Sequence, residues 1–185
     1  MVKVEVRRPK QEEREELNQF FSLVIKDTFL KEGISDLVYD MEEEIETKNQ
    51  YLQADFDSNG RNRYFLIAAT GDKIIGTIAF GSSNSLIQEC SEGDLTDLIE
   101  IGTVYIHPDY QNRGIGTLLL NTMLLTLMNK GVEEFCLDSG YKNAQKIWRK
   151  KLGEPDYWMK NYWGEGSDHM IWHRLLKEIP VLFTI

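Results

Sequence analysis

The turn at residues 110–116 contains two glycines and an arginine, and its residue types most readily suggest chemistry. It follows an apolar run that indicates a strand and precedes an apolar run that indicates a helix. The first N–H groups of a helix lack intrahelical acceptors and carry the positive end of the helix dipole. Gly114 and Gly116 lack Cβ atoms, so their N–H groups can approach an anion, and Arg113 adds positive charge. The turn therefore predicts an anion site, above all for phosphate.

The glycine pattern of this turn does not identify a ligand by itself. Leu119 stands where the third glycine of a G-x-G-x-x-G fingerprint would fall, and no G-K-[S/T] follows. A tight strand–helix turn without any ligand explains the two glycines equally well. On the residues alone, both interpretations stay open.

Histidines and tryptophans near the C-terminus form a second group of candidates. His169 and His173 lie four residues apart, which places them on one face of a strand. No cluster of carboxylates or thiols joins them in sequence, so we predict no metal site. Trp158, Trp163 and Trp172 are interpreted as core or dimer-contact aromatics, or as walls of an acceptor pocket.

The elements that must position these residues alternate between strand and helix along the second half of the chain. Gly33 predicts the end of the first helix, Ser35 or Asp36 caps the second, and Gly71-Asp72 predicts a hairpin turn. Residues 81–94 are expected to form a surface loop. We predict an α/β fold with a mixed sheet in a single domain over residues 1–185. The expected strands are 2–8, 63–70, 73–80, 95–108, 132–138 and 169–176, and the expected helices are 11–33, 35–55, 115–130 and 142–153.

The charge of the chain limits its partners. It has 21 Lys and Arg against 30 Asp and Glu, a net charge of −9. An acidic protein lacks the basic surface that nucleic acids require, so no nucleic-acid partner is expected. The acidic run at residues 40–46 is interpreted as a solvated helix face that could also attract a cationic molecule.

The cysteines and the N-terminal residues indicate the cellular compartment in which the protein is expected. Cys90 and Cys136 lie far apart and form no C-x-x-C pair, so a disulfide framework is not expected and a reducing compartment is favoured. The first residues lack the apolar core of a signal peptide, and no run approaches 18 apolar residues. We therefore expect a cytoplasmic protein without a membrane partner.

Three segments resemble one known family. The run "IEIGTVYIHPDYQNRGIGTLLL" at residues 99–120 looks like the central motif of the GNAT (general N-acetyltransferase) superfamily. "NAQKIWRKKLG" at residues 143–153 and "GSDHMIWHRL" at residues 166–175 are similar to its next helix and its closing strand. The resemblance spans nearly the whole chain and implies a GNAT fold, in which helices flank a central mixed sheet with a splayed parallel strand pair.

The resemblance implies acetyl-CoA as the cofactor. Val104 and Ile106 would offer backbone groups to the pantetheine arm, and Gln111 would lie at the edge of the diphosphate loop. Asn143 matches a family position that reaches the cofactor, although a helix cap explains it equally well. By similarity, the diphosphate would be wrapped by the backbone of Asn112, Arg113, Gly114, Ile115, Gly116 and Thr117.

The implied reaction is attack of an amine on a thioester. An alkylamine is mostly protonated at neutral pH, so the reaction needs a group that takes its proton. Glu100 occupies a position where many family members carry a carboxylate, and Gly102 marks a bulge that would open the strand. The other interpretation of Glu100 is a solvent-facing carboxylate. Trp148 stands where relatives carry a proton-donating tyrosine, and an indole N–H does not give up its proton as a phenol does.

These arguments lead to three functional hypotheses. The first is an N-acetyltransferase that acts on an amine of a small molecule or peptide. The resemblance also allows a homodimer, because members of this family form dimers. The second is a GNAT-fold module that binds acyl-CoA without turnover, which Trp148 keeps open. The third is a nucleotide-binding α/β protein, which would bind ATP rather than coenzyme A.

Overall fold

The computed structural model of the chain describes residues 3–183, so Val2, which begins the first expected strand, lies outside the described residues. Its helices are α1 (Arg14–Glu32), α2 (Val38–Ser58), α3 (Ser85–Cys90), α4 (Ile115–Asn129) and α5 (Lys142–Leu152), with 3-10 turns η1 (Gln11–Glu13), η2 (Pro108–Tyr110) and η3 (Leu176–Glu178). Its strands are β1 (Glu5–Arg7), β2 (Arg63–Thr70), β3 (Lys73–Ser82), β4 (Ile99–Ile106), β5 (Glu134–Ser139), β6 (Tyr157–Met159) and β7 (His169–Leu175).

These strands form a mixed sheet. Among the described residues, seven strands are hydrogen-bonded in the order β1-β2-β3-β4-β5-β7-β6. β1 pairs with β2, and β7 pairs with both β5 and β6, in antiparallel fashion. β4 and β5 are the parallel pair, and their ladder joins only Ile99 to Phe135 and Glu100 to Cys136. The predicted α/β fold with a mixed, helix-flanked sheet and a parallel strand pair is confirmed.

The chain folds into two compact units. Unit 1 contains the residues up to Phe80 together with Thr103–Leu125, and unit 2 contains Gly81–Gly102 and Thr126–Leu182. The strand β4 and the helix α4 each contribute residues to both units. The single domain over residues 1–185 stays a prediction. Within residues 3–183, no helix combines the length and the apolar character that a membrane crossing requires.

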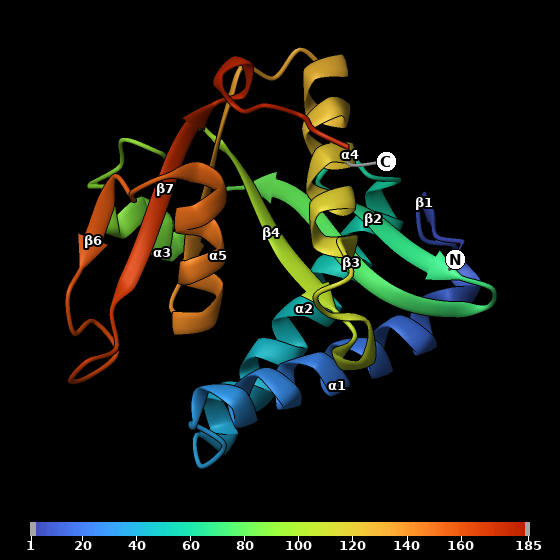
Figure 1. Cartoon of the computed structure of the whole chain (residues 1–185), viewed down its shortest axis with the longest axis horizontal. Coiled ribbons are helices and arrows are strands. Elements are labelled where there is room, and N and C mark those ends of the chain that lie inside the picture. The colour runs from blue at the N-terminus through green and yellow to red at the C-terminus, as the bar shows by residue number, and fades with distance from the viewer. Residues whose placement is uncertain (1–2, 184–185) are drawn as a thin grey trace. The chain divides into compact units, whose positions relative to one another are not determined.

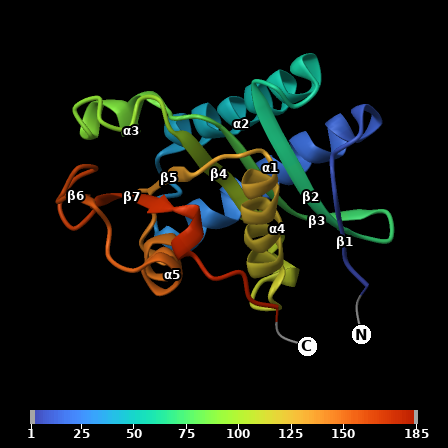
Figure 2. The ribbon, with the colours of Figure 1, turned by 90° about the horizontal axis from the view of Figure 1, so that it is seen from above.

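In unit 1 the helices α1 and α2 lie side by side, and α2 packs against β2 (Figures 1 and 2). Gly33 ends α1 in the left-handed conformation, as predicted. The predicted cap of α2 is wrong, because α2 begins after Leu37, which makes no side-chain cap, rather than after Ser35 or Asp36. The buried face of α1 consists of Leu17, Phe20, Phe21, Val24, Ile25 and Phe29.

In unit 2 the helix α5 packs on β5 and β7 (Figure 1). The loop expected at residues 81–94 is not entirely loop, because it contains α3. The side-chain oxygen of Asn84 accepts a hydrogen bond from the backbone N–H of Ile87 and so caps this helix. Ile87 is fully buried and packs with Cys136 and Ile171, which explains why so short a helix forms here.

The thiol of Cys136 is fully buried in this cluster, and burial raises its pKa to about 12. Because the thiolate is the reactive form, we expect Cys136 to resist a disulfide reagent such as DTNB in the native protein. The Cys90→Ser variant should release no more than a trace of chromophore when native and one equivalent in guanidinium. Rapid reaction of the native variant would contradict the burial of Cys136.

Candidate functional site

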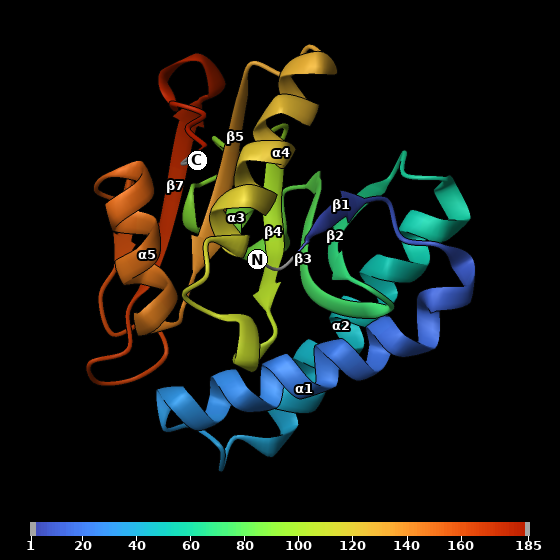
Figure 3. The same ribbon diagram turned by 45° about the vertical axis from the view of Figure 1, so that its right-hand side comes forward.

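The predicted anion site lies in unit 1, where β4 leads through η2 into α4 (Figure 3). The start of the turn is fixed by Gln111, whose Nε2 donates to the carbonyl of Ile106 at 3.2 Å. The Oε1 of Gln111 accepts from Lys31 Nζ at 3.0 Å, and the same ammonium pairs with Asp27 at 2.6 Å. These contacts tie the turn to α1.

The backbone of this turn is shaped to present its N–H groups. Asn112 and Gly114 have positive φ values of 59° and 81°, a conformation that glycine and asparagine adopt most readily. The hydrogen bonds within residues 3–183 include none donated by the backbone N–H groups of Arg113, Gly114, Ile115 and Gly116. Consecutive unused donors at the positive end of a helix form an anion-binding nest.

The turn also has room for a ligand. A Cβ atom at Gly114 would meet no atom within 4 Å, so this side of the turn is open. Asn112 and Arg113 are exposed, and the guanidinium of Arg113 lies 5.3 Å from the ring centre of Tyr110. Donors, positive charge and space therefore coincide, and the residues fit a bound diphosphate.

Gly76 on β3 is a structural requirement of this site that the sequence did not reveal. A Cβ atom there would lie 2.9 Å from Leu119 Cδ1, 3.0 Å from Ile106 Cδ1 and 3.3 Å from the carbonyl oxygen of Tyr105. Glycine therefore lets β4 and α4 pack against β3 without displacing these atoms. A glycine inside a strand pattern is the available signal, because such residues often mark a close approach.

The predicted base Glu100 lies in unit 2 and is only 5% exposed, so the interpretation as a solvent-facing carboxylate is wrong. Its Oε2 accepts a hydrogen bond from the backbone N–H of Asn84 at 2.8 Å. A Cβ atom at Gly102 would lie 2.9 Å from Glu100 Oε1, so glycine is needed there for the approach of the carboxylate. The backbone distortion expected at Gly102 falls on Thr103, whose φ of 52° is unusual for a β-branched residue.

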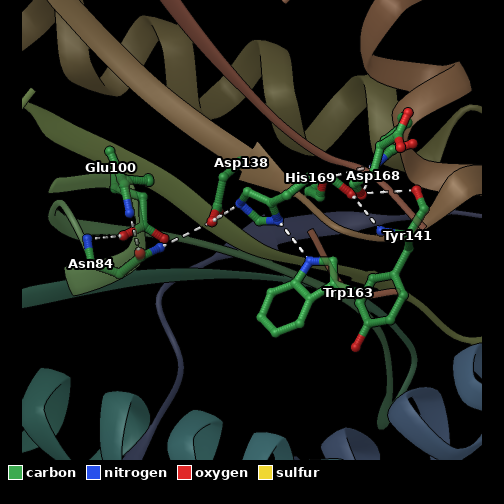
Figure 4. Close-up of polar contacts among 10 residues, drawn as sticks. Asn84, Glu100, Asp138, Tyr141, Trp163, Asp168 and His169 are labelled. Carbon is green, nitrogen blue, oxygen red and sulfur yellow. Dashed lines mark hydrogen bonds and ion pairs between the residues drawn. The ribbon is translucent and has the colours of Figure 1, made fainter. Parts of the chain in front are cut away.

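Glu100 is joined to a chain of polar side chains that the sequence did not predict (Figure 4). The side-chain amide of Asn84 lies 3.4 Å from Asp138 Oδ2. The same oxygen lies 3.0 Å from His169 Nε2, and His169 Nδ1 accepts from the indole N–H of Trp163 at 3.1 Å. The residues come from β4, β5, β7 and two loops, so only the register of the strands brings them together.

The two histidines of β7 therefore bind different carboxylates. His173 pairs with Glu134 at 2.6 Å in a partly exposed position, whereas His169 is 3% exposed. Within the described part of the chain, no group of three or more histidine, cysteine, aspartate or glutamate side chains has the geometry of a metal site. The histidine spacing in the sequence reflects one face of the strand.

The remaining predicted residues lie on α5. Asn143 is the second residue of α5 and is exposed, whereas Tyr141 is the residue before the helix, so the interpretation of Asn143 as a cap is wrong. Trp148 is 8% exposed and belongs to the buried face of α5. Of the three tryptophans assigned to core or contacts, Trp172 is fully buried, and Trp158 and Trp163 are exposed.

Of the predicted cofactor residues, all but Asn143 come together in the strand, turn and first helical turn of unit 1. Val104 and Ile106 lie on β4, and Gln111 begins the turn. Ile115, Gly116 and Thr117 form the first turn of α4. Glu100 and Asn143 belong to unit 2.

Residues 29–153, which are more than half of the chain, match a family model described as "Acetyltransferase (GNAT) family". Comparison with curated proteins gives no match. Several solved structures share the fold at low sequence identity.

The structure of PaiA N-acetyltransferase from Thermoplasma acidophilum with coenzyme A is 20% identical, covers 93% of this chain and 99% of that chain, and has a TM-score of 0.65. YncA from Salmonella typhimurium with acetyl-CoA is 16% identical, with 95% of each chain covered and a TM-score of 0.64. A ribosomal-protein-alanine N-acetyltransferase from Brucella melitensis is 17% identical over 92% of this chain and 99% of that chain, with a TM-score of 0.64.

Proposed function

Because the chain belongs to the GNAT acetyltransferase family, we propose that it transfers the acetyl group of acetyl-CoA to an amine of a small molecule or peptide. The observation that carries this proposal is the set of unused N–H groups from Arg113 to Gly116 at the start of α4. A diphosphate would satisfy these donors and the dipole of the helix together. Two structural neighbours, PaiA and YncA, hold coenzyme A and acetyl-CoA.

Each predicted site residue has a role in this proposal. The backbone of residues 112–117 binds the diphosphate, with Gln111 holding the edge of the turn. The backbone groups of Val104 and Ile106 bind the pantetheine arm, and Asn143 contacts the cofactor from α5. Acetyl-CoA supplies an activated acetyl group as a thioester.

Glu100 receives the proton of the acceptor ammonium, directly or through a water molecule. Its Oε2 accepts a hydrogen bond from the N–H of Asn84, which holds the carboxylate in place, and a carboxylate is a group that can take up a proton. Trp148 donates no proton to the departing thiolate, because it is buried and its indole N–H is not acidic. The second amine proton passes to the sulfur as the C–N bond forms and the C–S bond breaks.

The test of the function is to incubate the protein with acetyl-CoA and a panel of primary amines while following release of free thiol. We expect thiol release that depends on the amine, with an acetylated product detected by mass spectrometry. The Cys90→Ser variant lowers the background of the thiol reagent. Coenzyme A binding without thiol release across a broad panel would favour the binding module, and tight ATP binding with no coenzyme A binding would favour the nucleotide-binding protein.

Gly114→Val tests the diphosphate site. The substitution adds a side chain to the open side of the turn at a φ of 81°, which strains the backbone that presents the N–H groups. We expect at least about tenfold weaker coenzyme A binding by calorimetry, because one charge-assisted hydrogen bond is worth about 1.5 kcal/mol or more.

The matched control is Gly71→Val in the β2–β3 turn. Gly71 also has a positive φ, of 58°, and open space around its Cβ position. It therefore reproduces the backbone strain without touching the site. Equal coenzyme A affinity of the folded Gly114→Val and Gly71→Val variants would contradict the assignment.

Glu100→Gln tests the proton acceptor. Glutamine keeps an oxygen that can accept from the N–H of Asn84 but cannot take up a proton. We expect kcat to fall about 100-fold or more, within the usual range for a general base, while coenzyme A affinity changes less than about twofold. Glu134→Gln is the control, because that carboxylate pairs with His173 at a partly exposed position. An unchanged kcat in Glu100→Gln would remove Glu100 from this role.

A further inference from the structure

Trp163 makes an unusual contact for a residue that is 57% exposed. Its indole N–H donates to the Nδ1 of His169, a side chain that is 3% exposed. If the indole turned toward solvent, its N–H would have water as an acceptor, so the hydrogen bond adds little stability on the side of Trp163. The buried imidazole, in contrast, depends on Trp163 for a donor.

The protonation of His169 is determined by its two partners. An indole N–H can only donate, so Nδ1 must carry a lone pair. The proton of the neutral ring therefore sits on Nε2, which donates to Asp138 at 3.0 Å. In this tautomer, Asp138 orients the ring so that Nδ1 presents an acceptor toward Trp163 (Figure 4).

Gly140 creates the space in which this acceptor can be reached. A Cβ atom at Gly140 would lie 2.7 Å from Trp163 Nε1, 3.2 Å from Trp163 Cδ1 and 3.4 Å from His169 Nδ1. The ring of Tyr162 borders the same space, with its centre 4.9 Å from the ring centre of Trp163 and 5.8 Å from that of His169. The space fits a thin, planar group that carries an N–H.

The loop that carries Trp163 is held by contacts that do not involve the indole. The Oδ1 of Asp168 accepts from the N–H of Asn161 at 2.8 Å, and the Oδ1 of Asn161 accepts from the N–H of Gly166 at 2.7 Å. The backbone of Trp163 donates to Ser167. The side chain of Trp163 can therefore rotate away while its loop stays folded.

We propose that the Nδ1 of His169 binds a planar N–H group of the acceptor, and that the indole of Trp163 holds the place of that group in the structure. A buried acceptor left without a donor is costly, so a ligand that brings a hydrogen-bond donor, such as a planar N–H, can replace Trp163 with little loss. Peptide amides and heteroaromatic N–H groups share this chemistry. The assignment to the acceptor rests on the proposed function, and it is favoured because Asn84 links Asp138 to Glu100, the proposed proton acceptor.

The binding point is tested without catalysis in the Trp163→Ala variant. Indole and N-methylindole are added as probes, and the imidazole nitrogens of the three histidines are followed by ¹⁵N NMR. We expect indole to shift the His169 signals and to bind about tenfold more tightly than N-methylindole, which lacks the N–H. N-methylacetamide serves as the peptide-amide probe in the same titration.

Trp158→Ala is the matched control, because the indole N–H of Trp158 donates to Asp168 at 2.7 Å and its side chain is 43% exposed. No selectivity for indole is expected there, since water can satisfy that carboxylate. A further variant, Gly140→Ala with Trp163→Ala, should block the probe. Equal binding of the two indoles to Trp163→Ala, or shifts confined to other histidines, would overturn the proposal.

The acceptor role is tested by acetyl transfer to glycine N-methylamide and to glycine N,N-dimethylamide, which share a primary amine but differ in one amide N–H. We expect kcat/KM to be about tenfold higher for the N-methylamide, and the preference to disappear in His169→Phe but persist in His173→Phe. Equal rates for both amides in the wild-type protein would overturn the acceptor role. Transfer to other amines of the panel but to neither amide would overturn the acceptor role, whereas no transfer across the whole panel, with the indole selectivity intact, would contradict the proposed function and leave the binding point in place.

Discussion

The N–H groups at the start of α4 are donors that the protein itself does not satisfy, and this constraint organises unit 1. The hydrogen bonds of residues 3–183 include none from the N–H groups between Arg113 and Gly116. Helix termini usually satisfy such groups with a capping side chain or with water. Here the turn instead exposes them beside an arginine, and Gln111 and Gly76 hold the strand and the helix in the positions that keep them aligned.

Unit 2 follows the opposite principle, because its buried polar groups are matched in pairs. Glu100 accepts a hydrogen bond from the backbone N–H of Asn84, and Asp138 accepts one from Nε2 of His169. The Nδ1 of His169 in turn accepts one from the indole N–H of Trp163. Each of these buried side chains therefore has a hydrogen-bond partner, as low-dielectric surroundings require. Trp163, which carries the last donor of this series, is an exposed residue. In our proposal, a ligand N–H replaces its indole N–H as the donor to His169.

The parts of the site that could be predicted from the sequence are those whose geometry is local. The turn from Gln111 to Gly116 was identified because strand, glycines and helix follow one another directly, and the hairpin at Gly71-Asp72 was confirmed for the same reason. The burial of Glu100 and the pairing of Asp138 with His169 depend on strand register, which no local pattern specifies. Asn84 was missed because its helix has only six residues within an otherwise polar segment.

Glycines in this protein serve two different physical purposes. This difference explains why the role of some glycines could be predicted from the sequence and the role of others could not. Gly114 is required by its positive φ, a local property that a turn motif reveals. Gly76, Gly102 and Gly140 are favoured by space, because a Cβ atom at each would lie 2.9 Å or less from a side-chain atom of another residue. Two of these spaces admit functional groups, the carboxylate of Glu100 and the indole of Trp163.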